Sequence, residues 1–338
     1  MHTLTLDPRE AGRILADTHG LKATAPLVPL GSELASTFRA TVGAREVAVK
    51  MQASSPKELA VQRWRAAVAS RLSAQGHPVP STLPARDGTI VATATHQGRD
   101  VAVTVTEWIP AAPYGELGDA LDAVAFGRTL GATAAKLQAT LVGAPRPPKP
   151  IQHTWAAHTM AETIAEHLPR VTDPEVRDIA ERARSIIAET VAPVAAELPR
   201  VLVHQDLHDS NVLATPAGEI AAIIDFDDML VGWRVAEPAI AAAYLARHST
   251  DPAAAVAAVA AGWESVLPFT EAERAAYPAL VVGRLALNAT VWHVRATGDR
   301  ADYARLRGTG TLATCAALLA GASSGTLATD GQAEAAGA

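Results

Sequence analysis

Residues 201–228 contain two short apolar runs, and each run is followed by side chains that suit chemistry at phosphate groups. Asp206 and Asn211 follow the first run, and Asp225 ends the second. One carboxylate can orient and deprotonate a hydroxyl group, while an amide oxygen and a second carboxylate can hold Mg²⁺ against a polyphosphate. These residue types, in this order, therefore predict phosphoryl transfer to a hydroxyl group.

A turn between the two runs positions these groups. Pro216-Ala217-Gly218 is a turn signal, so Val212–Thr215 and Glu219–Ile224 should form a small hairpin. Such a hairpin sets Asn211 and Asp225 near one another at adjacent strand ends. The alternative, that the polar residues are ordinary turn and cap residues, is disfavoured because two ordered motifs occur across one hairpin.

The combined pattern resembles a known superfamily. His204-x-Asp206-x-x-x-x-Asn211, followed by Ile224-Asp225-Phe226, is similar to the catalytic and metal motifs of the aminoglycoside phosphotransferase and choline kinase superfamily. These are small-molecule kinases with a fold like that of protein kinases. The resemblance implies that Asp206 is catalytic, that Asn211 and Asp225 bind Mg²⁺, and that His204 braces the loop.

The fold class expected from this resemblance is α+β, a bilobal protein-kinase-like fold. Residues 1–108 are expected to form a small antiparallel-sheet lobe with one main helix, which binds the nucleotide. Residues 109–322 are expected to form a large, mostly helical lobe for catalysis and substrate binding. The small, polar residues 323–338 are expected to be a disordered tail.

The first lobe should supply the phosphate contacts. The loop Gly31–Phe38 reads Gly-Ser-Glu-x-x-x-x-Phe, which resembles the phosphate-side loop of hydroxylysine kinase-like members and makes Ser32 a nucleotide contact. Lys50 closes a Val-Ala-Val-Lys strand end and matches the lysine that pairs with phosphates. An ordinary hairpin and a solvated lysine are the alternatives.

A helix should follow the lysine strand, with Ser55 as its N-cap. Kinase-like folds anchor the lysine with a carboxylate on this helix, and Glu58 is the candidate. Gln62 is the position that aligns most naturally with the family pattern, so the lysine partner stays open. Further on, the backbone groups of Glu107 and Ile109 are expected to contact the adenine edge.

The connection after Asp228 is short. Glu237 fits the place of a loop-bracing carboxylate, although the family more often has Asp there. A protein kinase needs a long activation segment at this point, so a peptide substrate is disfavoured. Asp227, Asp228 and Trp233 are candidate substrate contacts. Asp209, Asp227, Asp228 and Glu237 make this region acidic, which suits an amine-bearing acceptor. Alternatively, Asp227 or Asp228 binds metal or caps a turn.

Two further groups of polar residues are expected to be structural. Arg284, Asn288 and Arg295 share one face of a predicted helix. That face is expected to be exposed, although a substrate-pocket wall is an alternative. His153 and His158 are five residues apart, which does not align them for metal binding on a helix.

The net charge and the cysteine content exclude several classes of protein. The formal charge of −6 over 338 residues gives no basic footprint for nucleic acid. Cys315 is the only cysteine, so an intrachain disulfide is impossible and a reducing cytoplasm is expected. No secretory signal and no membrane span are predicted. Oligomeric state stays open.

The sequence thus predicts a small-molecule kinase that uses ATP, or GTP, and Mg²⁺. Its acceptor is expected to be an amine-bearing alcohol: an amino alcohol, a hydroxy amino acid such as hydroxylysine, or an aminoglycoside. An antibiotic-inactivating phosphotransferase of the same fold is one alternative. A nucleotide-binding pseudokinase or regulatory module is another, disfavoured because Asp206 and Asp225 are both present.

Overall fold

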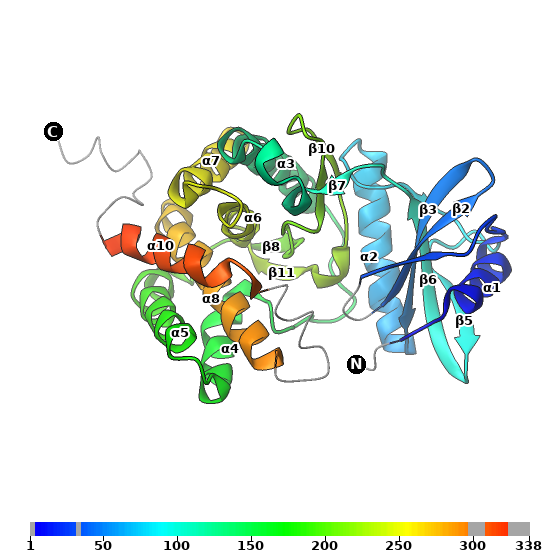
Figure 1. Cartoon of the computed structure of the whole chain (residues 1–338), viewed down its shortest axis with the longest axis horizontal. Coiled ribbons are helices and arrows are strands. Elements are labelled where there is room, and N and C mark those ends of the chain that lie inside the picture. Colours follow the sequence, from blue (N-terminus) through cyan, green and yellow to red (C-terminus); the bar gives the residue numbers. More distant parts are fainter. Residues whose placement is uncertain (1–3, 32–34, 297–307, 324–338) are drawn as a thin grey trace. The chain divides into compact units, whose positions relative to one another are not determined.

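The computed structural model describes residues 4–31, 35–296 and 308–323, which form two compact units (Figure 1). The first unit runs to Ala111 and includes Pro145–Lys149 and Ala221–Asp227. The second contains the rest of the chain. The two short segments were expected in the second lobe, and they pack with the first unit instead. The lobe boundary near residue 109 remains a prediction.

The first unit is built on an antiparallel sheet with the order β1-β2-β3-β6-β4, and β5 also pairs with β6. Strands β4 and β5 pair with successive parts of β6 rather than with each other. The strands are β1 (Val28–Leu30), β2 (Ser36–Val42), β3 (Arg45–Ala53), β4 (Thr82–Leu83), β5 (Ala92–His96) and β6 (Arg99–Glu107).

Local capping sets the bounds of the two helices of this unit, α1 (Pro8–His19) and α2 (Pro56–Ala74). Asp7 accepts hydrogen bonds from two first-turn N–H groups of α1, and Gly20 ends the helix with a left-handed φ of 70°. Ser55 caps α2. The Ser55 cap is the one that the sequence analysis predicts.

Strand β3 divides its side chains between two faces because successive residues point in opposite directions. Val47, Val49 and Met51 are buried in the hydrophobic core that α1 covers. Lys50 and Gln52 consequently lie on the opposite face, where Gln52 contacts Gln62 of α2. The alternation thus keeps the predicted lysine out of the core and on the side of α2.

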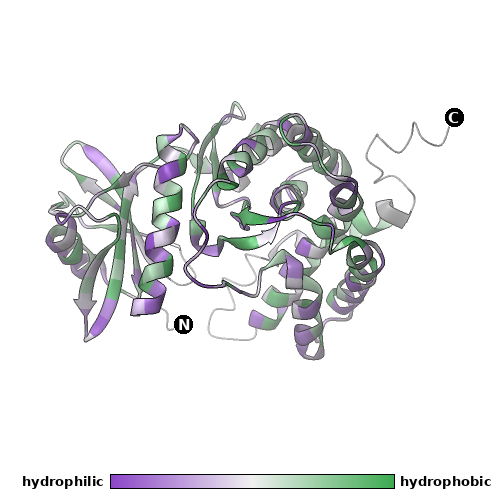
Figure 2. Ribbon diagram, turned by 180° about the vertical axis from the view of Figure 1, so that it is seen from behind, coloured by the Kyte–Doolittle hydropathy of each residue, from purple (hydrophilic) through white to green (hydrophobic). Residues whose placement is uncertain are grey.

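The second unit is mostly helical, and α6 lies inside it, against α3, α7 and α8 (Figure 1). All eleven residues of α6 are buried, whereas the outer helices carry hydrophilic stretches (Figure 2). The helices are α3 (Ala123–Leu141), α4 (Met160–His167), α5 (Pro174–Ile186), α6 (Ala236–Ala246), α7 (Pro252–Glu264), α8 (Glu271–Arg295) and α10 (Thr311–Ser323).

Local signals set the bounds of two helices of this unit. Helix α3 starts at Ala123 because the Asp122 side chain accepts the N–H groups of its first turn. Helix α5 ends at Ile186, and a π-turn and a 3₁₀ turn follow, where Pro193 cannot continue the α-helical hydrogen bonds.

Short strands deliver the polar motif residues. Strand β8 (Arg200–Val203) pairs antiparallel with β11 (Leu230–Trp233), and β7 (Ala112–Pro113) pairs with β9 (Val212–Ala214). Strand β10 (Ile220–Ile223) follows the predicted turn, which Thr215 and Glu219 close through a 2.9 Å backbone hydrogen bond. Within the described ranges, no helix is long and apolar enough to cross a membrane.

Candidate active site

The loop from His204 to Asn211 follows β8, and Glu237 of α6 bonds to its backbone. Glu237 at the start of α6 is fully buried, and its Oε1 accepts the N–H of Gln205 at 2.6 Å. Gln205 has a left-handed φ of 71°, unusual for a residue other than glycine. His204 Nδ1 accepts the N–H of Asp206 at 3.2 Å. Glu237 and His204 therefore both bond to the backbone of this loop.

The environment of Glu237 changes its acidity. Burial raises the pKa of Glu237 to about 7, although N–H groups of Gln205 and His204 oppose the rise, and the charge of Asp206 adds to it. The carboxyl group is therefore neutral below about pH 7 in the folded protein, while an exposed glutamate ionises near pH 4.5.

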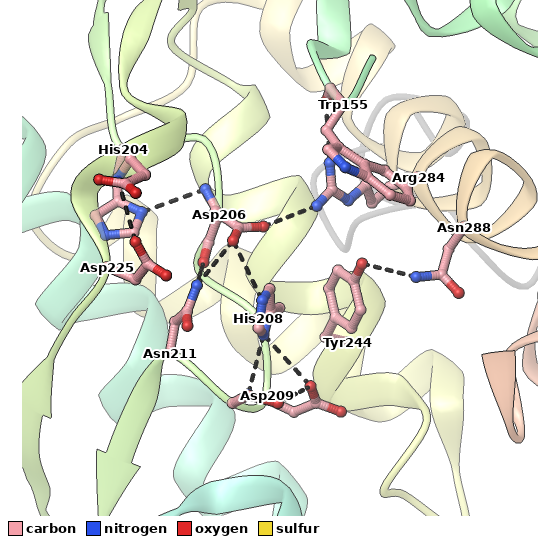
Figure 3. A network of polar contacts seen from close by, with 12 residues as sticks. Trp155, His204, Asp206, His208, Asp209, Asn211, Asp225, Tyr244, Arg284 and Asn288 are labelled. Atoms are coloured by element: carbon pink, nitrogen blue, oxygen red, sulfur yellow. Dashed lines mark hydrogen bonds and ion pairs between the residues drawn. The ribbon is translucent and has the colours of Figure 1, made fainter. Parts of the chain in front are cut away.

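The Asp206 carboxylate is the centre of a polar network (Figure 3). Its Oδ1 lies 3.0 Å from the Nη2 of Arg284. Its Oδ2 accepts the side-chain amide of Asn211 at 2.8 Å and lies 3.2 Å from Nε2 of His208. Although burial opposes ionisation, the hydrogen bond from His208 and the charge of Arg284 hold the pKa of Asp206 well below its usual range. The group is thus a fixed carboxylate.

His208, which the motif analysis did not single out, donates to that carboxylate. The backbone N–H of Ser210 donates to Nδ1 of His208 at 3.0 Å, so the proton of a neutral ring lies on Nε2, toward Asp206. The ring also packs on Tyr244 at a centroid distance of 5.3 Å. Its position two residues after Asp206 was the signal that could have identified it.

The expected exposed face of the last long helix is wrong. Arg284 and Asn288 of α8 are 2% and 1% exposed, and Arg284 contacts Asp206 directly. The side-chain amide of Asn288 donates to the hydroxyl of Tyr244 at 2.9 Å. The available signal was the setting of Arg284 in the otherwise apolar stretch Leu280–Leu287, because a lone charge there is buried and must be paired.

Asp209 lies within the loop, and its charge is neutralised by its own partners. Its Oδ2 lies 2.8 Å from Nε2 of His248 and 3.4 Å from Nη1 of Arg247. Burial opposes ionisation, but the contacts with His208 and His248, together with the charge of Arg247, hold the pKa of Asp209 far below its usual range. Asp209 therefore forms a structural ion pair that connects the loop to the C-terminal end of α6.

Residues near position 155 also meet the loop. The carbonyl of Trp155 accepts from Nη1 of Arg284 at 3.0 Å, and Nε2 of His153 lies 2.9 Å from the carbonyl of Asp228. The Asp228 charge acts on Arg284. Trp233, proposed from sequence as a substrate contact, is 9% exposed and packs its ring against His158.

Lys50 forms the charged centre of the first unit. Its Nζ lies 2.7 Å from Oδ1 of Asp225 and 2.8 Å from Oδ2 of Asp227. Burial alone would lower the pKa of Lys50, but these two carboxylates outweigh it and raise the pKa above the usual value. Asp225 has a left-handed φ of 62°. The structure therefore brings Lys50 together with Asp225, which is 175 residues away in sequence, and with Asp227.

The helix partner of this cluster is a glutamine rather than Glu58. Among the described residues, Lys50 has no ion pair with Glu58, which lies in the first turn of α2. Gln62 instead donates to Gln52 at 3.4 Å, and Gln52 donates to Asp227 at 2.5 Å. The second candidate position on α2 thus reaches the lysine cluster through a chain of amides.

The predicted nucleotide-edge residues lie where β6 ends. The N–H of Glu107 donates to Ser81, and its carboxylate accepts the N–H of Ser81 at 2.9 Å. The carbonyl of Ile109 accepts the N–H of Ala111. The N–H of Glu107 and the carbonyl of Ile109 are therefore hydrogen-bonded within the protein. Ser32 lies outside the described residues.

Comparison with known proteins decides the family. The profile of the phosphotransferase enzyme family matches residues 9–277, most of the chain and both units. The chain belongs to this family. The predicted enzyme class, a phosphotransferase, is confirmed by this match, as is the resemblance drawn from the His204–Phe226 motifs.

Relatives of this phosphotransferase include hydroxylysine kinases. The mouse (Mus musculus) enzyme is 31% identical over 129 residues, which cover 36% of this chain and 34% of that enzyme. The zebrafish (Danio rerio) enzyme is 37% identical over 98 residues, covering 27% of this chain and 28% of that enzyme. The chain thus spans about a third of the length of the curated relatives it matches.

Solved structures confirm the fold of the phosphotransferase. A microcompartment-associated aminopropanol kinase has a TM-score of 0.66 at 20% identity, covering 93% of this chain and 98% of its own. An amicoumacin kinase in complex with AMP-PNP and Ca²⁺ has a TM-score of 0.67 at 16% identity, covering 92% and 93%. At such low identities these matches show the fold alone, and they confirm the predicted α+β class with its antiparallel-sheet and helical parts.

Proposed function

We propose that the chain transfers the γ-phosphoryl group of ATP, or GTP, to the hydroxyl of a small amine-bearing acceptor. The observation that carries this proposal is the Asp206 carboxylate, held ionised by donors from Arg284, His208 and Asn211. Such a carboxylate can align an acceptor hydroxyl for attack on a phosphoryl group and receive its proton as the bond to phosphorus forms.

The donor set fits a hard divalent cation. The side-chain N–H groups of Asn211 are directed to the Oδ2 and backbone carbonyl of Asp206, so its amide oxygen points away from that carboxylate. Asp225 offers a partly exposed carboxylate. Amide and carboxylate oxygens are the ligands that Mg²⁺ prefers, and we assign Asn211 and Asp225 to it. When bound, Mg²⁺ offsets the negative charge of the polyphosphate.

Lys50 is assigned to the phosphates of the nucleotide. A primary ammonium can bind phosphate oxygens as a point charge, and the face of β3 that carries Lys50 is outside the hydrophobic core. Asp227 is assigned to the positioning of this lysine, because it contacts Nζ at 2.8 Å. Glu107 and Ile109 keep their proposed role at the adenine edge, and Ser32 keeps its own at the phosphates.

The acceptor proposal rests on the relatives and on acidic groups near the loop. Hydroxylysine, a hydroxy amino acid with amines, is the first candidate because hydroxylysine kinases are 31–37% identical to parts of this chain. Asp228 remains the candidate contact for a substrate amine. The packing of Trp233 against His158 favours an indirect role for that residue.

The experiment is Mg²⁺-dependent phosphorylation across a panel that contains hydroxylysine, 1-amino-2-propanol, choline, homoserine and aminoglycosides. The proposal predicts acceptor-dependent ADP release with at least one amine-bearing alcohol, and a phosphorylated product by mass spectrometry. Nucleotide binding without phosphorylation of any panel member would contradict it and favour the pseudokinase alternative.

A further inference from the structure

Arg284 is the one charged side chain in a run of apolar residues on α8, and it is almost wholly buried. Both of its terminal guanidinium nitrogens are directed to acceptors. Nη1 donates to the carbonyl of Trp155 and Nη2 donates to Oδ1 of Asp206, each at 3.0 Å. A guanidinium that makes two such bonds in one plane fixes both the distance and the orientation of its partners.

Aromatic rings hold this guanidinium from the sides. Its central carbon lies 5.3 Å from the centroid of Trp155 and 5.4 Å from that of Tyr244 (Figure 3). Asn288, one helical turn after Arg284, donates to the Tyr244 hydroxyl. Cation–π contacts and this anchored ring restrict the rotamers of Arg284, so Asp206 is bound to a rigid group.

Counting the acceptor sites of Asp206 shows what remains for a substrate. A carboxylate offers about four lone-pair sites, two on each oxygen. On Oδ2, Asn211 and His208 occupy both. On Oδ1, the contact made by the described residues is that of Arg284. One site on Oδ1 is therefore left for a hydroxyl donor.

We propose that Arg284 is the positioning residue of Asp206, which presents Oδ1 to the acceptor hydroxyl and fixes the direction of its remaining lone pair. This inference rests on the proposed function for its kinetic consequence. Without the guanidinium, the carboxylate can rotate about its Cβ–Cγ bond and the hydroxyl loses its alignment. A displacement of about 1 Å at a reacting group can lower the rate by roughly 10²-fold.

A purely structural role makes different predictions. If the Arg284–Asp206 pair served only to stabilise the fold, substitution would lower the melting temperature and leave the turnover of the folded fraction unchanged. If it positions Asp206, turnover falls in fully folded protein. Nucleotide binding is unaffected in either case, because the Lys50 cluster contains no contact with Arg284.

The experiment compares Arg284→Ala and Arg284→Lys with Arg274→Ala, a matched control on α8. Arg274 pairs with Glu264 and is not in the Asp206 network. The proposal predicts a roughly 10²-fold lower kcat for Arg284→Ala with Mg²⁺-ATP and 5-hydroxylysine, and a KM for ATP within about twofold of wild type. Partial activity in Arg284→Lys and rescue of Arg284→Ala by millimolar guanidinium chloride are also expected.

Two kinetic outcomes overturn the inference. One is a kcat of folded Arg284→Ala within about threefold of wild type. The other is a kcat loss that guanidinium does not reverse while Arg284→Lys is as impaired as Arg284→Ala. If wild-type protein phosphorylates no acceptor, the proposed function fails on its own. The crystal structure of Arg284→Ala then decides: a reoriented Asp206 carboxylate supports the inference, and an unchanged one contradicts it.

Discussion

Glu237 makes the stability of the folded protein depend on pH through its buried carboxyl group, which binds the His204–Asn211 loop. Its folded-state pKa is about 7, against a usual value of 4.5, so between these pH values the folded protein binds one proton more than the unfolded chain. Stability should therefore fall as pH rises from about 4.5 to 7 and then level off. The total change is roughly 3 kcal/mol at most.

Glu237→Gln should remove this slope, because the neutral amide retains an oxygen for the Gln205 N–H and has no charge to bury. Urea unfolding at pH 5 and pH 8 measures it. The variant should gain stability relative to wild type as pH rises, whereas Glu166→Gln, at an exposed position, should show no such trend. A wild-type protein with equal stability at both pH values would contradict the account of Glu237.

The contacts of Lys50 with Asp225 and Asp227 predict that Glu58 of α2 is not needed to hold the lysine. Lys50 pairs with Asp225 and Asp227, so Glu58→Gln should leave the KM for ATP within about twofold of wild type. Lys50→Met should lower kcat/KM for ATP by roughly tenfold or more, since it removes a charge-assisted contact to phosphate. Steady-state kinetics check both, with Lys57→Met, at an exposed position, as the control.

A Glu58→Gln variant as impaired as Lys50→Met would show that the helix carboxylate, and not the Asp225–Asp227 pair, anchors the lysine.

At the scale of elements, glycines allow α3 and α7 to pack closely. A Cβ on Gly131 would lie 2.1 Å from the carbonyl oxygen of Val259, and one on Gly262 equally close to that of Arg128. Helix backbones cannot move apart locally without losing packing along their length. These two glycines therefore set the spacing between the helices.

Gly131→Ala should destabilise the protein by roughly 1–3 kcal/mol or more, as overpacking of a core does. Gly12→Ala is the matched control. Gly12 also lies inside a helix, but the nearest atom to an added Cβ is 3.5 Å away, so helix propensity should make this change neutral or stabilising by up to about 1 kcal/mol. Thermal unfolding of both variants tests it, and equal effects would refute the close-packing account.

The elements that sequence predicted well are those with local signals. The bounds of α1 follow from Asp7 and Gly20, and the start of α2 follows from Ser55 and Pro56, because caps act within a few residues of a helix end. The Asp206 and Asn211 motif is equally local. Its internal hydrogen bond spans only five residues.

The features that could not be predicted from the sequence depend on residues that are distant along the chain. Arg284 was expected on an exposed face because helical spacing shows which residues share a face and not what packs on it. Here α4, α5, α6 and α10 surround α8, so faces that would otherwise meet solvent are buried. Likewise, Asp225, one partner of Lys50, lies 175 residues away, beyond the reach of any sequence periodicity.

For the whole molecule, binding of nucleotide should appear as added stability. A ligand that binds only the folded state stabilises it by about 2.7 kcal/mol at a concentration 100 times its Kd. A non-hydrolysable ATP analogue with Mg²⁺ should therefore raise the melting temperature of wild-type protein, and more weakly that of Lys50→Met. Equal shifts in both proteins would contradict the assignment of Lys50 to the phosphates.

The central claim is that Asp206 is the carboxylate on which phosphoryl transfer depends, and Asp206→Asn tests it most directly. The amide keeps the shape of the side chain but cannot accept the hydroxyl proton. The measurement is kcat for phosphorylation of the best acceptor with Mg²⁺-ATP, beside Asp178→Asn as an exposed control. We predict a loss of roughly 10²–10⁴-fold with nucleotide binding retained. Turnover of Asp206→Asn within about tenfold of wild type would contradict the claim.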